Sequence, residues 1–484
     1  MRGAVACFIF KVFQNLYPEI GSGATLFVHY YNTINTNNMI KNDTITMSDN
    51  LKDYRFPPID LLKDHKCEHS GLSVRELDKN INRLKSVLSD CKIEVADIKA
   101  FVGPAVTLYQ VIVASGVRIS KIRRYQDDIE WAMSSKSIRI VPLPGSLGIE
   151  VANERPVKVS LRSMLEDEAF RKSKAVLPVA IGYTTMQEVK VFDLADAPHL
   201  LVAGATGQGK SVCLDVIVTS LLYAKLPSEL KFVFIDPKKS QFSPFSKLDF
   251  HYLAMLPDTA SVKDVKSDAV VKDSVTSEKV LRSLCMEMEQ RCELLSETGV
   301  NNIGHYNEKH KGHRSDSDDD CGFLPYIVVM IDEYADLIMN DFDRNSKDSA
   351  KSIYSSIIRL AQKGKAVGIH LVIATQRPSR DIITGLVKAN FPTRLAFRVS
   401  TKEDSLTIID APGAEKLIGN GDMLYCSGKD VERLQCAMIE EEEINAVTKF
   451  IGGQTGEGKS HDAPHYLPDV DDISDDLDTF NSHR

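Results

Sequence analysis

The 484-residue sequence contains no pair of cysteines spaced as CxxC. Its nine cysteines are scattered from Cys7 to Cys436. An odd, unpatterned set of thiols fits a reducing cytoplasm better than a disulfide framework or a zinc site, and small buried side chains are their expected role. The sequence therefore predicts a cytoplasmic protein, for which membrane association through partners stays open.

A long apolar run is also missing. The apolar stretch after Arg2 is interrupted by Lys11 and Gln14, whereas a membrane helix requires about 20 apolar residues. No small-residue cleavage pattern follows this stretch, so we expect neither a membrane segment nor a signal peptide. We also find no convincing internal repeat.

The third feature missing is an excess of positive charge. The formal net charge is -8 and the sequence pI is about 5.9, so the chain as a whole does not have the charge of a nucleic-acid-binding protein. Any contact with DNA must be local. Lys and Arg alternate with apolar residues from Lys363 to Lys402, whereas aspartates crowd the segment from Asp469 to Asp478.

What the sequence does contain is ordinary globular composition, with 43% hydrophobic residues over a length that allows about three domains. Polar, Asn-rich residues before position 54 and the polar, acidic residues after Gly452 predict disorder at both ends. We expect a disordered segment at 1–53, a small α+β domain at 54–155, a larger α/β domain at 156–452 and an acidic disordered tail at 453–484.

The small domain is predicted from alternating helix and strand patterns. The expected elements are helices at Asp78–Leu88 and Ile119–Met133, strands at Thr107–Val113 and Ile138–Val141, and a turn at Pro142–Gly148.

The larger domain shows short apolar runs that alternate with longer helical patterns. This alternation predicts an α/β fold with a mainly parallel sheet and helices on its faces. The predicted strands are Leu200–Ala203, Phe232–Ile235, Ile327–Ile331 and Leu371–Ala374.

A phosphate-binding loop is predicted directly after the first of these strands. Its sequence fits G-x-x-x-x-G-K-[ST] and is followed by an apolar helix, Val212–Tyr223. Backbone amides in such a loop turn toward phosphate oxygens, the lysine reaches the β and γ phosphates, and the serine hydroxyl ligates Mg²⁺. The expected ATP site comprises Gly204, Ala205, Thr206, Gly207, Gln208, Gly209, Lys210 and Ser211.

A second match to the same expression, Gly453–Ser460, lies in the wrong context. The residues before it, Glu440–Ile451, have the pattern of a charged amphipathic helix rather than a buried strand. Pro464 and the polarity of the following residues argue against a phosphate-binding helix. We interpret this match as a coincidence.

The acidic partners of the phosphate loop are predicted at the end of the strand Ile327–Ile331. Asp332 would hold the Mg²⁺ shell, and Glu333 would orient or deprotonate the attacking water. Gln376 follows the next strand and is a candidate sensor of the γ-phosphate, although it could simply cap the turn before Arg377-Pro378. Lys238 and Gln241 are expected at the same carboxyl edge of the sheet.

Several further segments, in order along the chain, resemble signatures of the FtsK/SpoIIIE family of DNA-pumping ATPases. The resemblance spans about residues 54–450. The segments are Gly103–Thr107, Gly148–Glu150, Pro198–Gly207, Ile235–Lys238, Tyr306–Lys309, Ala374–Ser379, Gly385–Asn390, Pro392–Phe397, Gly413–Leu417 and Gly421–Leu424.

The resemblance implies a RecA-like motor that assembles as a homo-oligomeric ring, usually a hexamer, and threads double-stranded DNA through a central pore. ATP hydrolysis at subunit boundaries would drive stepping in chromosome segregation or DNA transfer. The pore loops should be basic, with Arg377, Arg380, Lys388 and the neighbourhood of Thr384–Asn390 as candidates; a solvated basic face is the alternative.

The chain departs from the family pattern in three ways. No membrane helix is visible upstream, and an acidic tail stands where many members carry a winged-helix module. The arginine expected near Gln362–Ala366 is replaced by Lys365, and another is replaced by Leu406. Because an arginine acting across a subunit boundary raises the rate by about 10³ to 10⁵, and lysine lacks its planar fork, the trans-acting group is open among Arg359, Lys365 and Arg394.

Two other functions remain possible from the sequence. One is a related ring ATPase that pumps protein, although such relatives would be expected to carry tandem ATPase domains. The other is an ATP-binding, DNA-associated scaffold with weak turnover.

Overall fold

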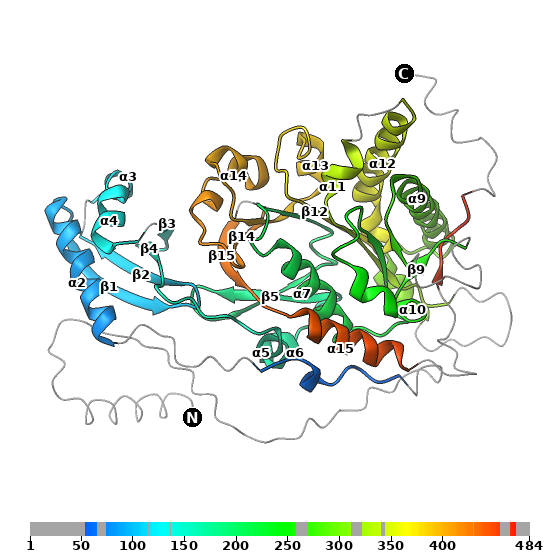
Figure 1. The fold of residues 1–484 in the computed structure, drawn as a ribbon, viewed down its shortest axis with the longest axis horizontal. Coiled ribbons are helices and arrows are strands. Elements are labelled where there is room, and N and C mark those ends of the chain that lie inside the picture. Colours follow the sequence, from blue (N-terminus) through cyan, green and yellow to red (C-terminus); the bar gives the residue numbers. More distant parts are fainter. Residues whose placement is uncertain are drawn as a thin grey trace. The chain divides into compact units, whose positions relative to one another are not determined.

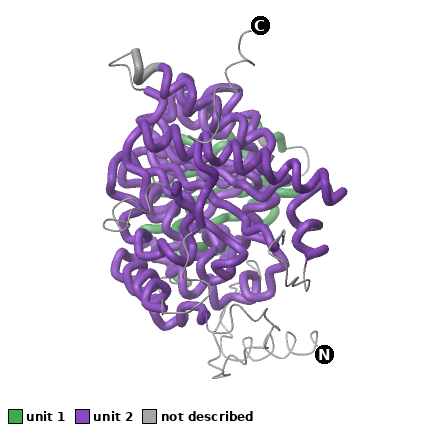
Figure 2. The backbone as a smooth tube through the Cα atoms, turned by 90° about the vertical axis from the view of Figure 1, so that its right-hand side faces the viewer, with its two compact units in different colours: residues 1–35, 71–154 green, residues 36–70, 155–484 purple. Residues whose placement is uncertain are grey.

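A computed structural model describes the chain over residues 54–64, 74–114, 117–135, 137–257, 269–310, 322–339, 344–428, 430–454 and 465–470. The chain divides into two compact units, one containing residues 71–154 and the other residues 155–484 (Figure 2). The predicted disorder of residues 1–53 and the second phosphate-loop match from Thr455 onward lie outside the described residues.

The smaller unit is a four-stranded antiparallel sheet with helices, in the strand order β1-β2-β4-β3. Its core combines Leu84 and Leu88 of the first helix with inward-facing strand residues such as Tyr109 and Ile149. The elements are α2 (Val74–Asp90), β1 (Val95–Val102), β2 (Val106–Val113), α3 (Ile119–Arg123), α4 (Gln126–Met133), β3 (Ile138–Leu143) and β4 (Ser146–Ala152).

Two predictions for this unit need correction. The helix expected over 119–133 is broken into α3 and α4 at Arg124-Tyr125. The turn expected at 142–148 is confined to Pro144-Gly145, and Gly148 lies within β4. A Cβ atom on Gly148 would lie 2.7 Å from Val141 and 2.9 Å from Leu108. The glycine is therefore needed for close packing within the sheet rather than for a turn.

The larger unit contains a ten-stranded mixed sheet in the order β10-β8-β11-β12-β7-β13-β14-β15-β5-β6. Its strands β5, β12, β14 and β15 are labelled in Figure 1. The strands from β10 to β13 run parallel, and those from β13 to β6 pair antiparallel. The strands are β5 (Pro178–Thr184), β6 (Val189–Asp193), β7 (His199–Ala203), β8 (Leu230–Ile235), β10 (Val270–Val271), β11 (Tyr326–Ile331), β12 (Ile369–Thr375), β13 (Thr393–Phe397), β14 (Asp422–Ser427) and β15 (Asp430–Cys436).

Helices cover both faces of this sheet, which confirms the predicted α/β class. Alternate residues of each central strand enter opposite cores: Leu200 and Val202 pack on the side of α7 and α15, whereas Leu201 and Ala203 pack on the side of α9 and α12. The α-helices are α5 (Leu161–Glu166), α6 (Glu168–Arg171), α7 (Lys210–Leu222), α9 (Ser274–Glu297), α10 (Ile303–His310), α11 (Tyr334–Ile338), α12 (Arg344–Lys363), α13 (Gly385–Asn390), α14 (Lys402–Ile409) and α15 (Glu441–Gly452).

The segment at residues 54–63 packs on the larger unit. The hydroxyl of Tyr54 shares a 2.8 Å hydrogen bond with that of Tyr252. Lys63 forms ion pairs with Glu440 and Glu442. Each of these contacts joins residues about 200 or more positions apart in the sequence, so local sequence patterns do not reveal them.

The C-terminal segment is also ordered in part, contrary to the prediction of a disordered tail. Residues 465–466 form strand β16 (His465–Tyr466), which pairs in parallel with β9 (Ala254–Met255). The amide of Leu467 donates to Met255 O at 2.8 Å, and its side chain is buried in the core beside α9. This short apolar stretch anchors a segment whose overall composition is polar. None of the helices in the described ranges combines the length and apolar character that a bilayer crossing requires.

Candidate functional site

The predicted phosphate loop connects the end of β7 to the start of α7. Gly207 and Gly209 have φ angles of 75° and 112°, in the region that favours glycine. A Cβ atom on Gly209 would lie 2.8 Å from the Cα atom of Gly421. The turn into α7 therefore requires glycine for both its backbone angle and the available space.

Backbone hydrogen bonds hold this loop to three neighbouring segments. The amide of Gly204 donates to Thr375 O at 3.3 Å, and that of Ala205 donates to Arg398 O at 3.0 Å. The amide of Gly421 donates to Gln208 O at 3.0 Å. The ends of β12 and β13 and the turn before β14 thus fix the position of the loop.

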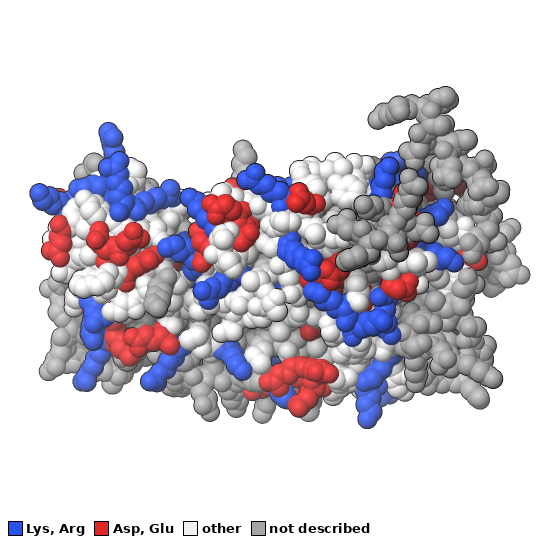
Figure 3. All heavy atoms as spheres, turned by 45° about the horizontal axis from the view of Figure 1, so that its top comes forward, with Lys and Arg blue, Asp and Glu red and all other residues white. Residues whose placement is uncertain are grey.

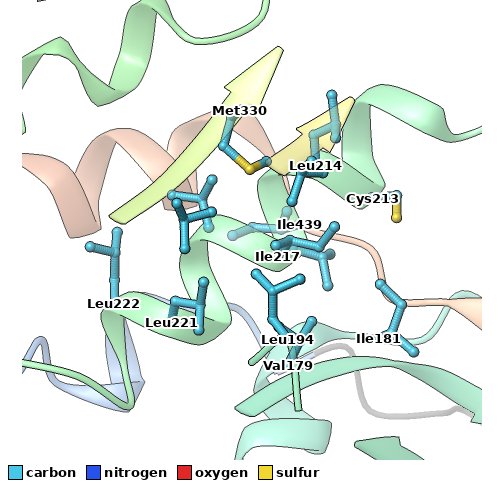
Figure 4. Packing of buried hydrophobic residues seen from close by; sticks show 14 of the residues in the cluster. Val179, Ile181, Leu194, Cys213, Leu214, Ile217, Leu221, Leu222, Met330 and Ile439 are labelled. Atoms are coloured by element: carbon cyan, nitrogen blue, oxygen red, sulfur yellow. The ribbon is translucent and has the colours of Figure 1, made fainter. Parts of the chain in front are cut away.

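Helix α7 is anchored behind the loop by one of the two cores. Leu214, Ile217 and Leu221 of this helix lie among Val179 of β5 and Met330 of β11 (Figure 4). The helix is apolar on nearly all sides because the sheet and neighbouring helices enclose it. Its N-terminus, where the phosphate loop ends, therefore has a rigid support.

The structure brings Lys210 together with Asp332, the first of the two predicted acids. The ammonium of Lys210 contacts Asp332 Oδ1, and both side chains are almost fully buried. Asp332 directly follows β11, which pairs in register with β8 and β12. Ser211 lies next to Lys210 in an exposed position at the start of α7.

Glu333, the second acid, adopts a φ angle of 51° and is fully buried. Its Oε1 accepts hydrogen bonds from the Thr375 hydroxyl at 2.9 Å and the Gln376 amide at 3.0 Å, and its Oε2 pairs with Lys238 Nζ at 2.7 Å. Burial alone would raise the pKa of this carboxyl, but Lys238 and these hydrogen bonds outweigh burial and hold the pKa below its usual value.

Gln376, the candidate sensor, contacts the phosphate loop. The hydroxyl of Thr206 donates to Gln376 Oε1 at 2.6 Å. The backbone amide of Gln376 also donates to Glu333. Gln376 therefore connects the phosphate loop to the Glu333 carboxylate.

Gln241 links the loop after β8 to helix α7. The backbone amide of Gln241 donates to Asp236 Oδ2 at 2.7 Å. Its side-chain Nε2 donates to Ser211 O at 3.0 Å and to Asp215 Oδ1 at 2.8 Å. Burial raises the pKa of Asp215 well above its usual value. The sequence analysis missed Asp215 and Thr375 as parts of this site. The sequence offered only their positions as a signal: Asp215 lies five residues after Lys210, and Thr375 lies directly before Gln376.

The three candidates for a trans-acting group differ in their surroundings. Arg359 on α12 pairs with Glu289 on α9, and its side chain is 40% exposed. Lys365 is exposed and donates to Asp196 O at 3.4 Å. Arg394 is buried, and it donates to Asp410 Oδ2 at 2.6 Å and to three backbone carbonyl oxygens, those of Phe391, Lys388 and Ile408.

The candidate DNA contacts follow β12 and lie around α13. Arg377 is exposed and lies 3.8 Å from Asp336, whereas Lys388 pairs with Asp410 at 2.6 Å. Arg380 and Lys388 line an open groove of about 260 Å³ together with Leu406. On the face in Figure 3, basic side chains are interspersed with acidic ones and do not form one continuous field.

The strand order, the phosphate loop and the acids at the end of β11 define a RecA-like P-loop ATPase, a class of nucleotide-binding proteins. Residues 160–380 match the FtsK/SpoIIIE family, and residues 56–153 match the FtsK alpha domain. The chain belongs to the FtsK/SpoIIIE family.

Curated relatives support this assignment. A DNA translocase FtsK of Chlorobaculum tepidum is 45% identical over 408 residues, which cover 83% of this chain and 48% of that protein. A DNA translocase FtsK of Oceanobacillus iheyensis is 39% identical over 435 residues, covering 88% and 52%. The chain thus spans about half the length of the curated relatives it matches.

Two solved structures share the fold. The pCW3 conjugation coupling protein TcpA, in its monomer form with ATPγS, is 22% identical with a TM-score of 0.51 and covers 77% of this chain and 99% of that one. The cytoplasmic domain of the Thermomonospora curvata type VII secretion ATPase EccC is 20% identical with a TM-score of 0.50, covering 65% and 36%. At these identities the likeness concerns the fold alone.

Proposed function

We propose that this chain is the motor of an ATP-dependent double-stranded DNA translocase that acts in the cytoplasm in chromosome partition at cell division or in DNA transfer. The observation that carries the proposal is the meeting of the phosphate loop, Asp332 and Glu333 at one edge of the sheet, in a member of the FtsK/SpoIIIE family.

In this proposal the phosphate loop binds the ATP phosphates, and Lys210 moves from Asp332 to the β and γ phosphates. Glu333 orients a water molecule and accepts its proton as the water oxygen bonds to the γ-phosphorus. The bond from that phosphorus to the β-phosphate oxygen breaks, which leaves ADP and inorganic phosphate. Gln376 lies where it would respond to the γ-phosphate, because it contacts both the loop and Glu333.

Mg²⁺ is the metal that fits this site. The Ser211 hydroxyl and the Asp332 carboxylate are oxygen donors on adjacent elements, and oxygen ligands are what Mg²⁺ prefers. When bound, the ion would neutralise charge on the phosphate oxygens.

We further propose a homo-oligomeric ring, usually a hexamer in this family, in which one subunit completes the site of its neighbour. Arg359 and Lys365 are the better candidates for the trans-acting group because their side chains are exposed. Arg394 would have to leave four hydrogen-bond acceptors in its own subunit, so we assign it a structural role.

DNA would be held through its phosphates by Arg377, Arg380 and Lys388. Arg377 and Arg380 are exposed, and Lys388 can exchange Asp410 for a phosphate oxygen. Binding of this kind is tolerant of sequence and weakens steeply with salt.

The proposal is tested by measuring ATP hydrolysis with and without double-stranded DNA for the wild type, Lys210→Ala and Glu333→Gln. We expect the wild type to be stimulated by DNA and both variants to lose the activity. Nucleotide binding should survive in Glu333→Gln, because the phosphate loop is intact. A wild type that binds ATP but hydrolyses none at any DNA or salt concentration would favour the scaffold function instead.

A further inference from the structure

Both oxygens of the Glu333 carboxylate are occupied in this structure. Oε1 accepts from the Thr375 hydroxyl and the Gln376 amide, and Oε2 pairs with Lys238 at 2.7 Å. A general base must bring an oxygen within hydrogen-bond distance of the proton it accepts. With these partners in place, Oε1 has two protein donors and Oε2 is held by the Lys238 ammonium.

Of these partners, Lys238 is the one that can leave without breaking the sheet. Thr375 and Gln376 belong to β12 and the residue after it, whereas Lys238 lies in the loop after β8 and its side chain is 37% exposed. Asp236 Oδ2 accepts from the amides of Gln241 and Phe242, which closes this loop at its base. The loop is therefore anchored while the lysine side chain reaches Glu333 from the solvent side.

The charges around this ion pair alternate in sign. Asp336 on α11 lies 3.9 Å from Lys238 and 3.8 Å from Arg377. Lys210 of α7 and Asp332, which follows β11, form their own buried pair next to Glu333. Lys238 thus has two carboxylates nearby, that of Glu333 at 2.7 Å and that of Asp336 at 3.9 Å. A phosphate oxyanion arriving from solvent would compete with them for its ammonium group, because lysine binds carboxylate and phosphate alike.

We propose that Lys238 is a positioning residue that holds Glu333 in a resting conformation, and that hydrolysis requires the Lys238–Glu333 ion pair to open when a phosphate oxyanion takes Lys238. This inference rests on the proposed function. The oxyanion comes either from the DNA backbone or from the bound nucleotide. Release of Lys238 frees Oε2 for water.

The test compares Lys238→Met with the wild type in steady-state ATP hydrolysis, with and without double-stranded DNA. Methionine keeps the unbranched side chain and removes the charge. We expect turnover without DNA to rise several-fold. Lys238→Arg, which can pair with Glu333 again, should return the turnover toward that of the wild type.

Lys239→Met is the matched control, since the neighbouring lysine is exposed and follows the same strand. We expect its turnover without DNA to equal that of the wild type. If the ratio of DNA-stimulated to basal turnover falls in Lys238→Met, DNA supplies the competing phosphate. If basal turnover rises while that ratio is unchanged, the nucleotide supplies it.

Two results would overturn the inference while leaving the proposed function intact. Turnover in Lys238→Met that falls with and without DNA would mean that the ion pair belongs to the active conformation. Unchanged turnover would mean that the pair has no part in catalysis. A wild type no faster than Lys210→Ala under every condition would instead reject the proposed function, and the inference with it.

Discussion

The hydroxyl of Thr206 donates a 2.6 Å hydrogen bond to Gln376 Oε1, which connects the phosphate loop to the end of β12. The backbone amide of Gln376 donates to Glu333 Oε1 at 3.0 Å. One residue therefore contacts both the segment that would hold the phosphates and the carboxylate that would act on water. Rearrangement of the loop around a γ-phosphate would reach Glu333 through Gln376.

Replacing Gln376 by Ala should lower kcat by about 10²-fold, as for other single hydrogen-bonding groups that act on a transition state. Nucleotide affinity should change little, because Lys210 and the loop amides remain. The measurement is kcat together with the dissociation constant of a slowly hydrolysed ATP analogue. An unchanged kcat would support the alternative that Gln376 only caps the turn before Pro378.

Gly209→Ala should destabilise the protein and abolish nucleotide binding. Gly207→Ala is the matched control: its φ angle is also positive, but no atom lies within 4 Å of the added Cβ, whereas at Gly209 the Cβ would meet Gly421 at 2.8 Å. We expect Gly207→Ala to lower the free energy of unfolding by about 1 kcal/mol, because alanine is strained at a positive φ angle. Gly209→Ala should cost about 1 to 3 kcal/mol more because of the overlap. Urea denaturation measures both, and equal losses would contradict this account.

Asp422→Asn should cost about 3 to 5 kcal/mol of unfolding free energy, because it removes the buried negative charge that pairs with the Arg433 guanidinium. Arg433 donates to Asp422 Oδ1 at 2.9 Å and to Oδ2 at 2.6 Å. Asp422 Oδ2 also accepts from the Ile418 amide, which holds the turn that contacts the phosphate loop. The comparison variant is Glu168→Gln, since its pair with Lys172 is exposed and such pairs contribute about 0 to 1 kcal/mol.

Much of the site could be predicted from the sequence because it lies in short, contiguous motifs. The phosphate loop follows its strand within a few residues, and Asp332 and Glu333 end an apolar run, so local patterns identify them. The Lys238–Glu333 pair joins residues 95 positions apart, and only the order of β8, β11 and β12 in the sheet brings them together.

The charge of a residue also does not tell what will surround it in the fold. Arg394 is a reasonable trans-acting candidate in the sequence, but the fold surrounds it with Asp410 and backbone carbonyl oxygens. The polar composition around His465–Tyr466 likewise hides a short strand that pairs with β9.

Stability should fall as the pH is lowered from about 6.5 toward about 4. Burial lowers the pKa of His370 from 6.5 to about 4 and that of His199 to about 3, and the proximity of His370 adds to the effect on His199. The unfolded chain therefore binds protons in this window that the folded chain does not. Each histidine lowers the free energy of unfolding by up to about 1.4 kcal/mol for each pH unit in this window.

His370→Asn should flatten this dependence, because it removes one of these protons while keeping a donor for Pro198 O, which lies 3.1 Å from His370 Nδ1. Urea denaturation at pH 7 and pH 5 gives the slope for each variant. The exposed His305→Asn should leave the slope as in the wild type. Equal slopes for the wild type and His370→Asn would show that His370 does not titrate in this way.

The central claim, that ATP hydrolysis at this site moves the protein along double-stranded DNA, is tested most directly by displacement of a third strand from a triplex placed at the end of a duplex. The wild type should release the third strand only with ATP, at a rate that falls as salt is raised. Glu333→Gln should bind the duplex and release nothing. ATP-independent release, or ATP hydrolysis stimulated by DNA without any release, would contradict translocation.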